Sequence, residues 1–319
     1  MTYQDLDEKV LEQLRQLSQR YAQTGQDLAS NLEGLLYTDY LKYWDYIALD
    51  TLMTLQHPRT TFPDEMIFVV YHQITELFFK LIQWEIDQML NADERLSFAV
   101  WHDKMQRINR YMDILVRSSD IMSEGMEYEQ FRKFRMALLP ASGFQSVQFR
   151  EIEIKSTHLW ELLDKAQRQD RQATGSPEEL YPFIYWKRGA IEEETGKKTI
   201  TLQHFEEKYD AHLQQLARQH AQKNLYALLE RRLVHMGNEE QQAIREEYRR
   251  FDNRFNVGWR LAHLRAAAKY LMKKKGEAVA ATGGTNWTKY LPPRFQKIIF
   301  FPSLWTEEEV AKWGTQLID

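Results

Sequence analysis

The 319-residue chain is long enough for one large domain or two ordinary ones, and its 43% hydrophobic residues suffice for a substantial core. A net charge of −4 argues against a general nucleic-acid binder, and the lack of cysteine excludes disulfides, thiolate metal sites and cysteine nucleophiles. The polar N-terminus has no apolar signal core, and no run of about 18 apolar residues occurs. We therefore expect no membrane partner and a cytoplasmic location.

Apolar residues recur at three- and four-residue steps, which predicts helices over residues 10–21 and 44–55. Pro58 and Pro63 then frame a loop, and the carboxylates of Asp64 and Glu65 suit the first turn of a long helix over residues 64–90. The main apolar stripe of this helix is formed by Met66, Val70, Ile74, Leu77, Leu81 and Trp84.

Another helix is expected over residues 101–115, and Pro140 and Gly143 then break the chain before a helix over 148–163. The polar, turn-rich stretch 167–182 predicts an exposed excursion near residues 167–200. Helices follow over 202–234 and 239–275. No segment alternates as a strand would, so the prediction is an all-α, bundle-like single domain over residues 1–319.

Two of the nine histidines stand out by their surroundings. His72 lies among aromatic residues on the long helix, with Glu76 one turn on to orient it. His263 precedes three alanines, which leave room for a flat group such as a haem bound through that histidine. Taken singly, each histidine is more often a packing residue. Two of them on separate aromatic-rich helices, without thiolates or zinc-like spacing, favour a haem.

The turn from Pro140 to Ile152 is compact and rich in serine, glycine and glutamine, and Arg135 lies just before it. Ser142 and Gly143 would let the backbone approach a small polar ligand closely, and a buried arginine would need an anion. The alternative is an ordinary corner between two helices, with a solvated arginine. Spacing alone favours the ordinary corner, because most such turns are only structural.

Four blocks of sequence carry a resemblance to a known family. They are residues 43–50 with Gln56, residues 64–80, Phe134-Arg135 with residues 140–151, and residues 259–263 with Thr282-Gly-Gly284. The chain resembles the tryptophan 2,3-dioxygenase family over about residues 35–305. The resemblance implies an all-α fold of the tryptophan/indoleamine dioxygenase type, haem b as cofactor, L-tryptophan and O₂ as substrates, and a homotetramer built as a dimer of dimers.

The resemblance also implies roles for individual residues. His263 matches the haem iron's axial ligand, and Trp259 belongs with it to the cofactor site. His72 matches the histidine that hydrogen-bonds the indole N–H, and Arg135 the arginine that holds the substrate carboxylate. The other matches to the substrate pocket are Phe68, Phe131, Ser142, Gly143, Thr282, and Tyr43 and Tyr46 from a neighbouring subunit.

The chain departs from the family pattern in three places. Pro63 stands where the family usually has histidine, the loop Ala281–Trp287 replaces a glycine- and serine-rich sequence, and the segment between His263 and Thr282 is longer than usual. These departures leave substrate identity open. Alternatives are a haem monooxygenase that hydroxylates another indole or aromatic amino acid, and a non-enzymatic haem or indole sensor.

Overall fold

The computed structural model describes residues 7–36, 42–92, 95–170, 175–192, 195–271 and 292–315. The chain divides into two compact units, Met1–Leu55 and Gln56–Asp319. An all-α fold is confirmed: among the described residues, the only strand-like pairings are two isolated bridges, Leu163 with Ile184 and Ile191 with Lys198. No helix in the described part of the chain is long and apolar enough to cross a membrane.

The first unit contains α1 (Glu8–Gln23), α2 (Leu28–Leu36), α3 (Tyr43–Tyr46) and α4 (Leu49–Leu52). The helix expected over 44–55 is thus two short helices, because Ala48 takes a left-handed backbone conformation (φ 49°) that interrupts the helix. None of these four helices buries a residue. The expectation of a single domain over residues 1–319 stays a prediction.

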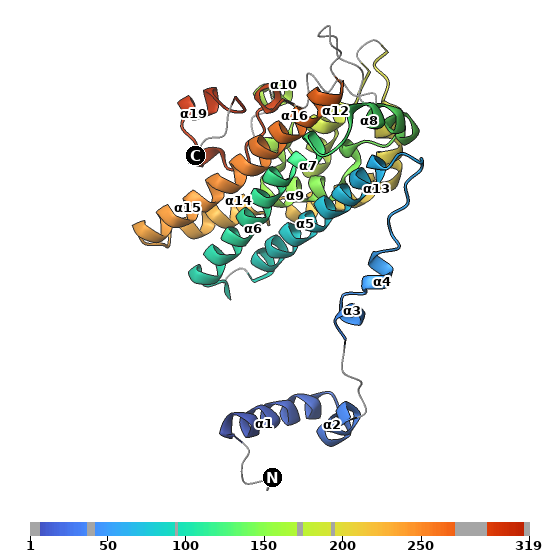
Figure 1. Ribbon diagram of the computed structural model, residues 1–319. Coiled ribbons are helices and arrows are strands. Elements are labelled where there is room, and N and C mark those ends of the chain that lie inside the picture. Colours follow the sequence, from blue (N-terminus) through green and yellow to red (C-terminus); the bar gives the residue numbers. More distant parts are fainter. Residues whose placement is uncertain are drawn as a thin grey trace. The chain divides into compact units, whose positions relative to one another are not determined.

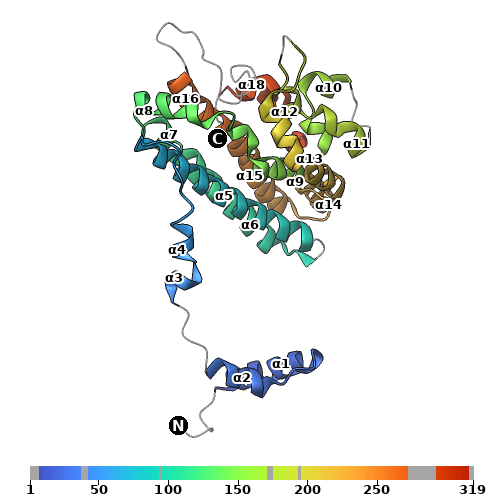
Figure 2. The ribbon, with the colours of Figure 1, turned by 90° about the vertical axis from the view of Figure 1, so that its right-hand side faces the viewer.

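Three long helices lie side by side in the second unit: α5 (Asp64–Ala92), α6 (Phe98–Ser118) and α15 (Asn238–Asn253) (Figures 1 and 2). The faces that they share are buried and largely apolar, with Ile82, Ile86 and Met112 among the inaccessible side chains. The Trp101 indole of α6 donates to the Tyr248 hydroxyl of α15 at 3.1 Å, which satisfies a polar atom inside this interface.

The apolar stripe predicted for α5 is not its buried face. Five of the six side chains are 39–64% exposed: Met66, Ile74, Leu77, Leu81 and Trp84. The buried face instead mixes Phe79, Ile82 and Ile86 with polar groups such as Glu85, which pairs with Lys104 at 3.1 Å. The paired polar residues interrupt the apolar repeat on the buried face of α5. The exposed face has the more regular apolar repeat, and the prediction therefore took it for the buried face.

The remaining helices complete the second unit around these three (Figures 1 and 2). They are α7 (Asp120–Ser123), α8 (Tyr128–Phe134), η3 (Arg135–Leu138), η4 (Gly143–Gln145), α9 (Val147–Ser156), η5 (Leu159–Leu162), α10 (Lys165–Asp170), α11 (Pro177–Leu180), η6 (Tyr181–Phe183), α12 (Tyr185–Arg188), α13 (Ile200–His220), α14 (Leu225–Leu233), the π-helix η7 (Arg254–Trp259), α16 (Arg260–Leu271), α18 (Pro293–Gln296), η8 (Pro302–Leu304) and α19 (Glu307–Ala311).

Part of the excursion expected near 167–200 belongs to the core. Leu180, Ile184 and Trp186 are buried in the main apolar cluster, so the described stretch 180–190 is not an exposed excursion. The helix expected over 202–234 is interrupted where the Asn224 side chain accepts from the Ala227 backbone N–H at 2.9 Å and starts α14. The helix expected over 148–163 ends at Ser156, because Thr157 is extended.

The helix expected over 239–275 is continuous through Leu271 but contains the π-helix η7. The buried carboxylate of Asp252, just before η7, accepts from the backbone N–H groups of Phe300 and Phe301 and from the Trp305 indole. Burial raises the pKa of Asp252 to about 6 despite these bonds. The C-terminal segment is thereby fixed to the helix that leads to His263.

Candidate active site

His72 lies on α5 with its Nδ1 atom 2.7 Å from the backbone oxygen of Phe68, one turn earlier. A carbonyl only accepts, so Nδ1 carries the proton and Nε2 of the neutral ring can accept a hydrogen bond. Burial lowers the pKa of His72, which favours the neutral form. The ring lies 4.1 Å from the Phe68 ring, centroid to centroid. His72 is therefore a fixed acceptor beside an aromatic surface.

Glu76 does not orient His72 through a hydrogen bond, contrary to the expectation from their spacing. Its carboxylate accepts from the Gln148 side chain at 2.8 Å, and its backbone oxygen accepts from the same amide at 2.9 Å. Its charge acts on His72 only as a minor influence that raises the pKa. The Phe68 carbonyl, a backbone group of the same helix, holds the imidazole instead.

An aromatic cluster surrounds Phe68 and joins α5, α8 and α16. The Phe68 ring lies 6.2 Å from Phe131 and 5.8 Å from Phe134, and Phe131 lies 4.4 Å from Tyr270. This cluster is separate from the main core. Its rings form a wall suited to a flat aromatic ligand.

Arg135 follows α8 directly and begins η3, one turn after Phe131. Its side chain is buried, and this desolvation, followed by the charge of Arg132, lowers its pKa. The start of α8 is fixed to α5, because the Asp64 carboxylate accepts from the Glu127 backbone N–H at 2.6 Å. The two helices thus place a buried arginine directly after Phe134, whose ring lies 5.8 Å from that of Phe68.

The turn after Arg135 is built by its own side chains. Ser142 and Gln145 form a reciprocal capping box, and the Thr201 hydroxyl donates to the Pro140 backbone oxygen at 3.1 Å. A Cβ atom at Gly143 would lie 3.6 Å from Cε1 and 3.8 Å from Nε2 of His263. The turn therefore brings its glycine against the ring of the second candidate histidine.

His263 lies on α16, and it is an exposed residue of that helix. Desolvation, followed by the positive charge that His72 would carry, lowers the pKa of His263 to about 4. The second cause means that the two histidines lie within electrostatic reach of each other. The ring of Trp259, one turn earlier, lies 6.3 Å from the His263 ring.

These residues fit a haem. The ring of His263 is neutral at pH 7 and accessible, as an iron ligand must be, and the neighbouring glycine presents no side chain to its Nε2 edge. Within the described ranges no group of three or more histidines, aspartates or glutamates could hold a bare metal ion. A single histidine with aromatic neighbours suits a metal that brings its own macrocycle.

The structure brings together two sets of the predicted residues. Phe68, His72, Phe131 and Arg135 share the aromatic cluster or adjoin it, and Gly143, Trp259 and His263 form the second set with Ser142 in the same turn. Thr282 and the Ala281–Trp287 loop lie outside the described residues. Tyr43 and Tyr46 belong to the first unit, where they are 70% and 75% exposed.

Sequence reasoning missed Phe134 and Tyr270 as members of the aromatic wall. Phe134 directly precedes Arg135 in the sequence, and Tyr270 lies seven residues after His263 on the same helix. The signal for Tyr270 was this spacing of two turns, which places both residues on one face of α16.

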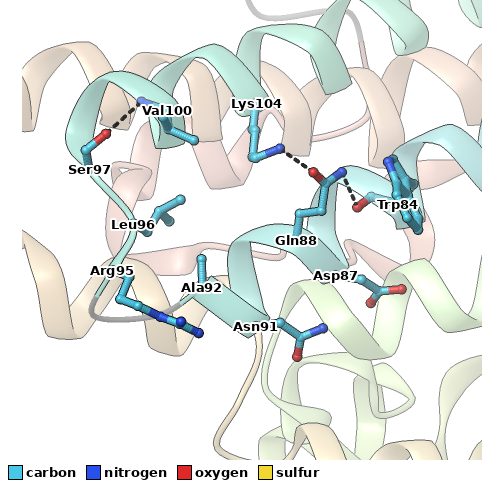
Figure 3. Close-up of a pocket in the computed structure, with 10 residues that line it drawn as sticks. All are labelled: Trp84, Asp87, Gln88, Asn91, Ala92, Arg95, Leu96, Ser97, Val100 and Lys104. Atoms are coloured by element: carbon cyan, nitrogen blue, oxygen red, sulfur yellow. Dashed lines mark hydrogen bonds between the residues drawn. The ribbon is translucent and has the colours of Figure 1, made fainter. Parts of the chain in front are cut away.

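A surface pocket of about 490 Å³ lies elsewhere, between the end of α5 and the start of α6 (Figure 3). Its lining includes Trp84, Arg95 and Lys104, and the Lys104 ammonium donates to Gln88 at 2.9 Å. None of the predicted site residues lines this pocket. We therefore place the candidate site at the two histidines and not at this hollow.

An all-α fold with two neutral histidines, a buried arginine and an aromatic wall defines a protein suited to a flat cofactor and an aromatic, anionic ligand. A family model described as tryptophan 2,3-dioxygenase matches residues 21–252, more than half of the chain. The chain belongs to the tryptophan 2,3-dioxygenase family. The matched range contains the arginine and His72 but ends before His263.

Individual relatives bear the same name. The Bacillus thuringiensis subsp. konkukian tryptophan 2,3-dioxygenase is 28% identical over 86% of this chain and 95% of its own length. Those of Shewanella woodyi and Herpetosiphon aurantiacus are 34% and 41% identical over 38% and 35% of this chain. In these two matches the chain spans 43% and 44% of the relative's length.

Proposed function

We propose that the protein is a haem-dependent dioxygenase that cleaves the indole C2–C3 bond of L-tryptophan with O₂ and yields N-formylkynurenine, the first step of tryptophan catabolism by the kynurenine pathway. The observation that carries this proposal is the joint placement of His72, the buried Arg135 and the Phe68 wall in a chain of this family. A haem b held by His263, with Trp259 beside it, would supply the activation of O₂.

Arg135 binds the substrate carboxylate in this proposal. Desolvation of its guanidinium favours an anionic partner, and a planar fork suits a carboxylate in a two-pronged pair. The aromatic substrate then lies along Phe68 and Phe131, with Ser142 and Gly143 in the pocket wall. Thr282 contacts the amino-acid end. Fixing one end of the substrate restricts which indole bond faces the oxidant, so these residues act by positioning.

His72 accepts the hydrogen bond of the indole N–H through Nε2. The Phe68 carbonyl supports this role because it keeps the proton of the neutral ring on Nδ1. An indole N–H is too weak an acid for a free imidazole to remove, so His72 orients the substrate and is not an obligatory base. The names of the relatives do not favour the monooxygenase alternative.

The protein acts as a homotetramer, a dimer of dimers, in which Tyr43 and Tyr46 reach the pocket of a neighbouring subunit. Two features support this assembly: none of helices α1–α4 buries a residue, and α5 exposes an apolar stripe along Leu77, Leu81 and Trp84. The absence of cysteine from the sequence suits the reducing conditions of the cytoplasm, where we place it.

Turnover tests the proposed function directly. The protein is loaded with haem, reduced, and mixed with air and L-tryptophan, and the near-ultraviolet absorbance of the formylated kynurenine is followed. We expect that absorbance to grow with time. Haem binding without any conversion of tryptophan would favour the sensor alternative, and a hydroxylated indole product would favour the monooxygenase.

A further inference from the structure

A buried ionic cluster lies between the Gly143 turn and the helix of His263. It consists of Arg150, Glu153, Tyr185 and Arg260, and we call it the Glu153 cluster. The Glu153 carboxylate accepts from Arg150 at 3.0 Å, from Arg260 at 2.8 Å and from the Tyr185 hydroxyl at 2.5 Å. Both arginines also donate to that hydroxyl, at 2.9 and 2.8 Å. Arg150 therefore serves in structural pairing.

The cluster is almost fully enclosed by protein. The Glu153 side chain is inaccessible, and both arginine side chains are 8% exposed. Aromatic rings cover the guanidiniums: Arg150 lies 5.2 Å from the Phe149 centroid, and Arg260 lies 5.0 Å from the Tyr185 centroid. Buried ion pairs often stabilise no more than apolar side chains of the same volume would. Stability alone therefore explains poorly why so much charge lies here.

The cluster connects the two elements that meet at His263. Arg260 is three residues before His263 on α16, so it anchors the same face of that helix one turn earlier. Glu153 and Arg150 lie on α9, which follows directly after the turn that presses Gly143 against the His263 ring. Tyr185 adds a third element, α12.

Among the described residues, no side chain or backbone group holds the His263 ring through a hydrogen bond. No hydrogen bond to its imidazole is formed within the described ranges, whereas histidines that bind metals usually donate their second ring nitrogen to a fixed acceptor. The direction of the ring then depends on how α16 lies against α9 and the turn. The Glu153 cluster is the buried polar connection between those elements.

We propose that Glu153 is a positioning residue for His263. By binding Arg260 of α16 and Arg150 of α9 at once, Glu153 fixes the direction of the imidazole and the space between its Nε2 edge and Gly143. The inference rests on the proposed function, because haem is the group that His263 would hold. Glu153 itself touches neither substrate nor cofactor in this scheme.

The test compares Glu153→Gln with Glu85→Gln. Glu85 is the matched control, because it is also buried and is bound by two cations, Lys104 at 3.1 Å and Arg107 at 3.3 Å. It differs in position, because it lies on α5, in the part of that helix that leads to α6. Haem is titrated into each apoprotein and the Soret band gives the affinity. We expect Glu153→Gln to weaken haem binding about 10- to 100-fold, as loss of support around a metal ligand does. Glu85→Gln should stay within about twofold of wild type.

Two further measurements keep the outcome decisive. Tyr185→Phe removes one hydroxyl and leaves both ion pairs, so it should fold and weaken haem binding by a smaller factor than Glu153→Gln. Imidazole nitrogen NMR of the apoproteins should show a shifted His263 resonance in Glu153→Gln and an unshifted one in Glu85→Gln. Equal haem affinities and unchanged His263 resonances in all variants would overturn the proposal. Failure of wild type to bind haem would instead defeat the proposed function, and the NMR comparison would still decide the role of Glu153.

Discussion

His72 and His263 carry the same ring in opposite settings. A backbone carbonyl four residues earlier holds His72, and its neighbours Phe68 and Tyr71 come from the same helix. His263 has an accessible ring, and its helix is held by the Glu153 carboxylate on α9 and the Tyr185 hydroxyl on α12, far away in the sequence. A group that must accept one hydrogen bond is fixed locally, whereas a group that must present a free nitrogen is positioned through its helix.

The largest expected effect concerns His263 as the proposed iron ligand. His263→Ala removes the only nitrogen that we assign to the iron, so the Soret band of the reconstituted protein should be lost. His72→Ala is the matched control and should keep the band, because His72 faces the substrate in our proposal. Full haem binding by His263→Ala, measured by absorbance after gel filtration, would refute the ligand assignment.

The Arg135→Leu substitution should have the second-largest effect. Loss of a buried carboxylate partner costs about 2–4 kcal/mol, so kcat/KM for L-tryptophan should fall roughly 30- to 900-fold. Tryptamine, which lacks the carboxylate, should show little difference between wild type and variant. Arg132→Leu, an exposed change at the end of α8, serves as the control. An unchanged KM for L-tryptophan in Arg135→Leu would count against the carboxylate role.

His72→Phe should have a smaller effect, since it removes one hydrogen bond and keeps a ring of similar shape. One such bond contributes about 1–1.5 kcal/mol, so kcat/KM should fall about 5- to 15-fold. With N1-methyltryptophan, which has no N–H to donate, wild type and variant should react at similar rates. A loss of several thousandfold would instead indicate that His72 is an obligatory base.

The remaining expected effect concerns the stability of the apoprotein and its dependence on pH. The pKa of His263 is 6.5 when unperturbed and about 4 in the folded chain, so the unfolded chain binds more protons between these values. The stability that the neutral His263 contributes is therefore fully present above about pH 6.5 and is lost as the pH drops toward 4. His263→Gln should show a shallower fall in urea unfolding curves over that window. Parallel curves for the two proteins would contradict the lowered pKa.

Sequence patterns predicted what local spacing determines. The helices, the break at Pro140 and the position of His72 near Phe68 all follow from residues within one or two turns. The buried face of α5 did not, because Glu85 and Gln83 are buried beside polar partners on other elements. The Glu153 cluster was invisible for the same reason: apart from the Arg150–Glu153 pair on α9, its hydrogen bonds join residues that are 32 to 107 positions apart along the chain. The family's residue roles came from resemblance and not from periodicity.

The proposed dioxygenase activity is tested most directly by counting the atoms of O₂ that enter the product. The haem-loaded, reduced protein is supplied with ¹⁸O₂ and L-tryptophan, and the product is weighed by mass spectrometry. We expect N-formylkynurenine with both added oxygen atoms labelled, because both come from one O₂ molecule. A product that carries a single labelled oxygen, or tryptophan recovered unchanged from a protein with full haem occupancy, would contradict it.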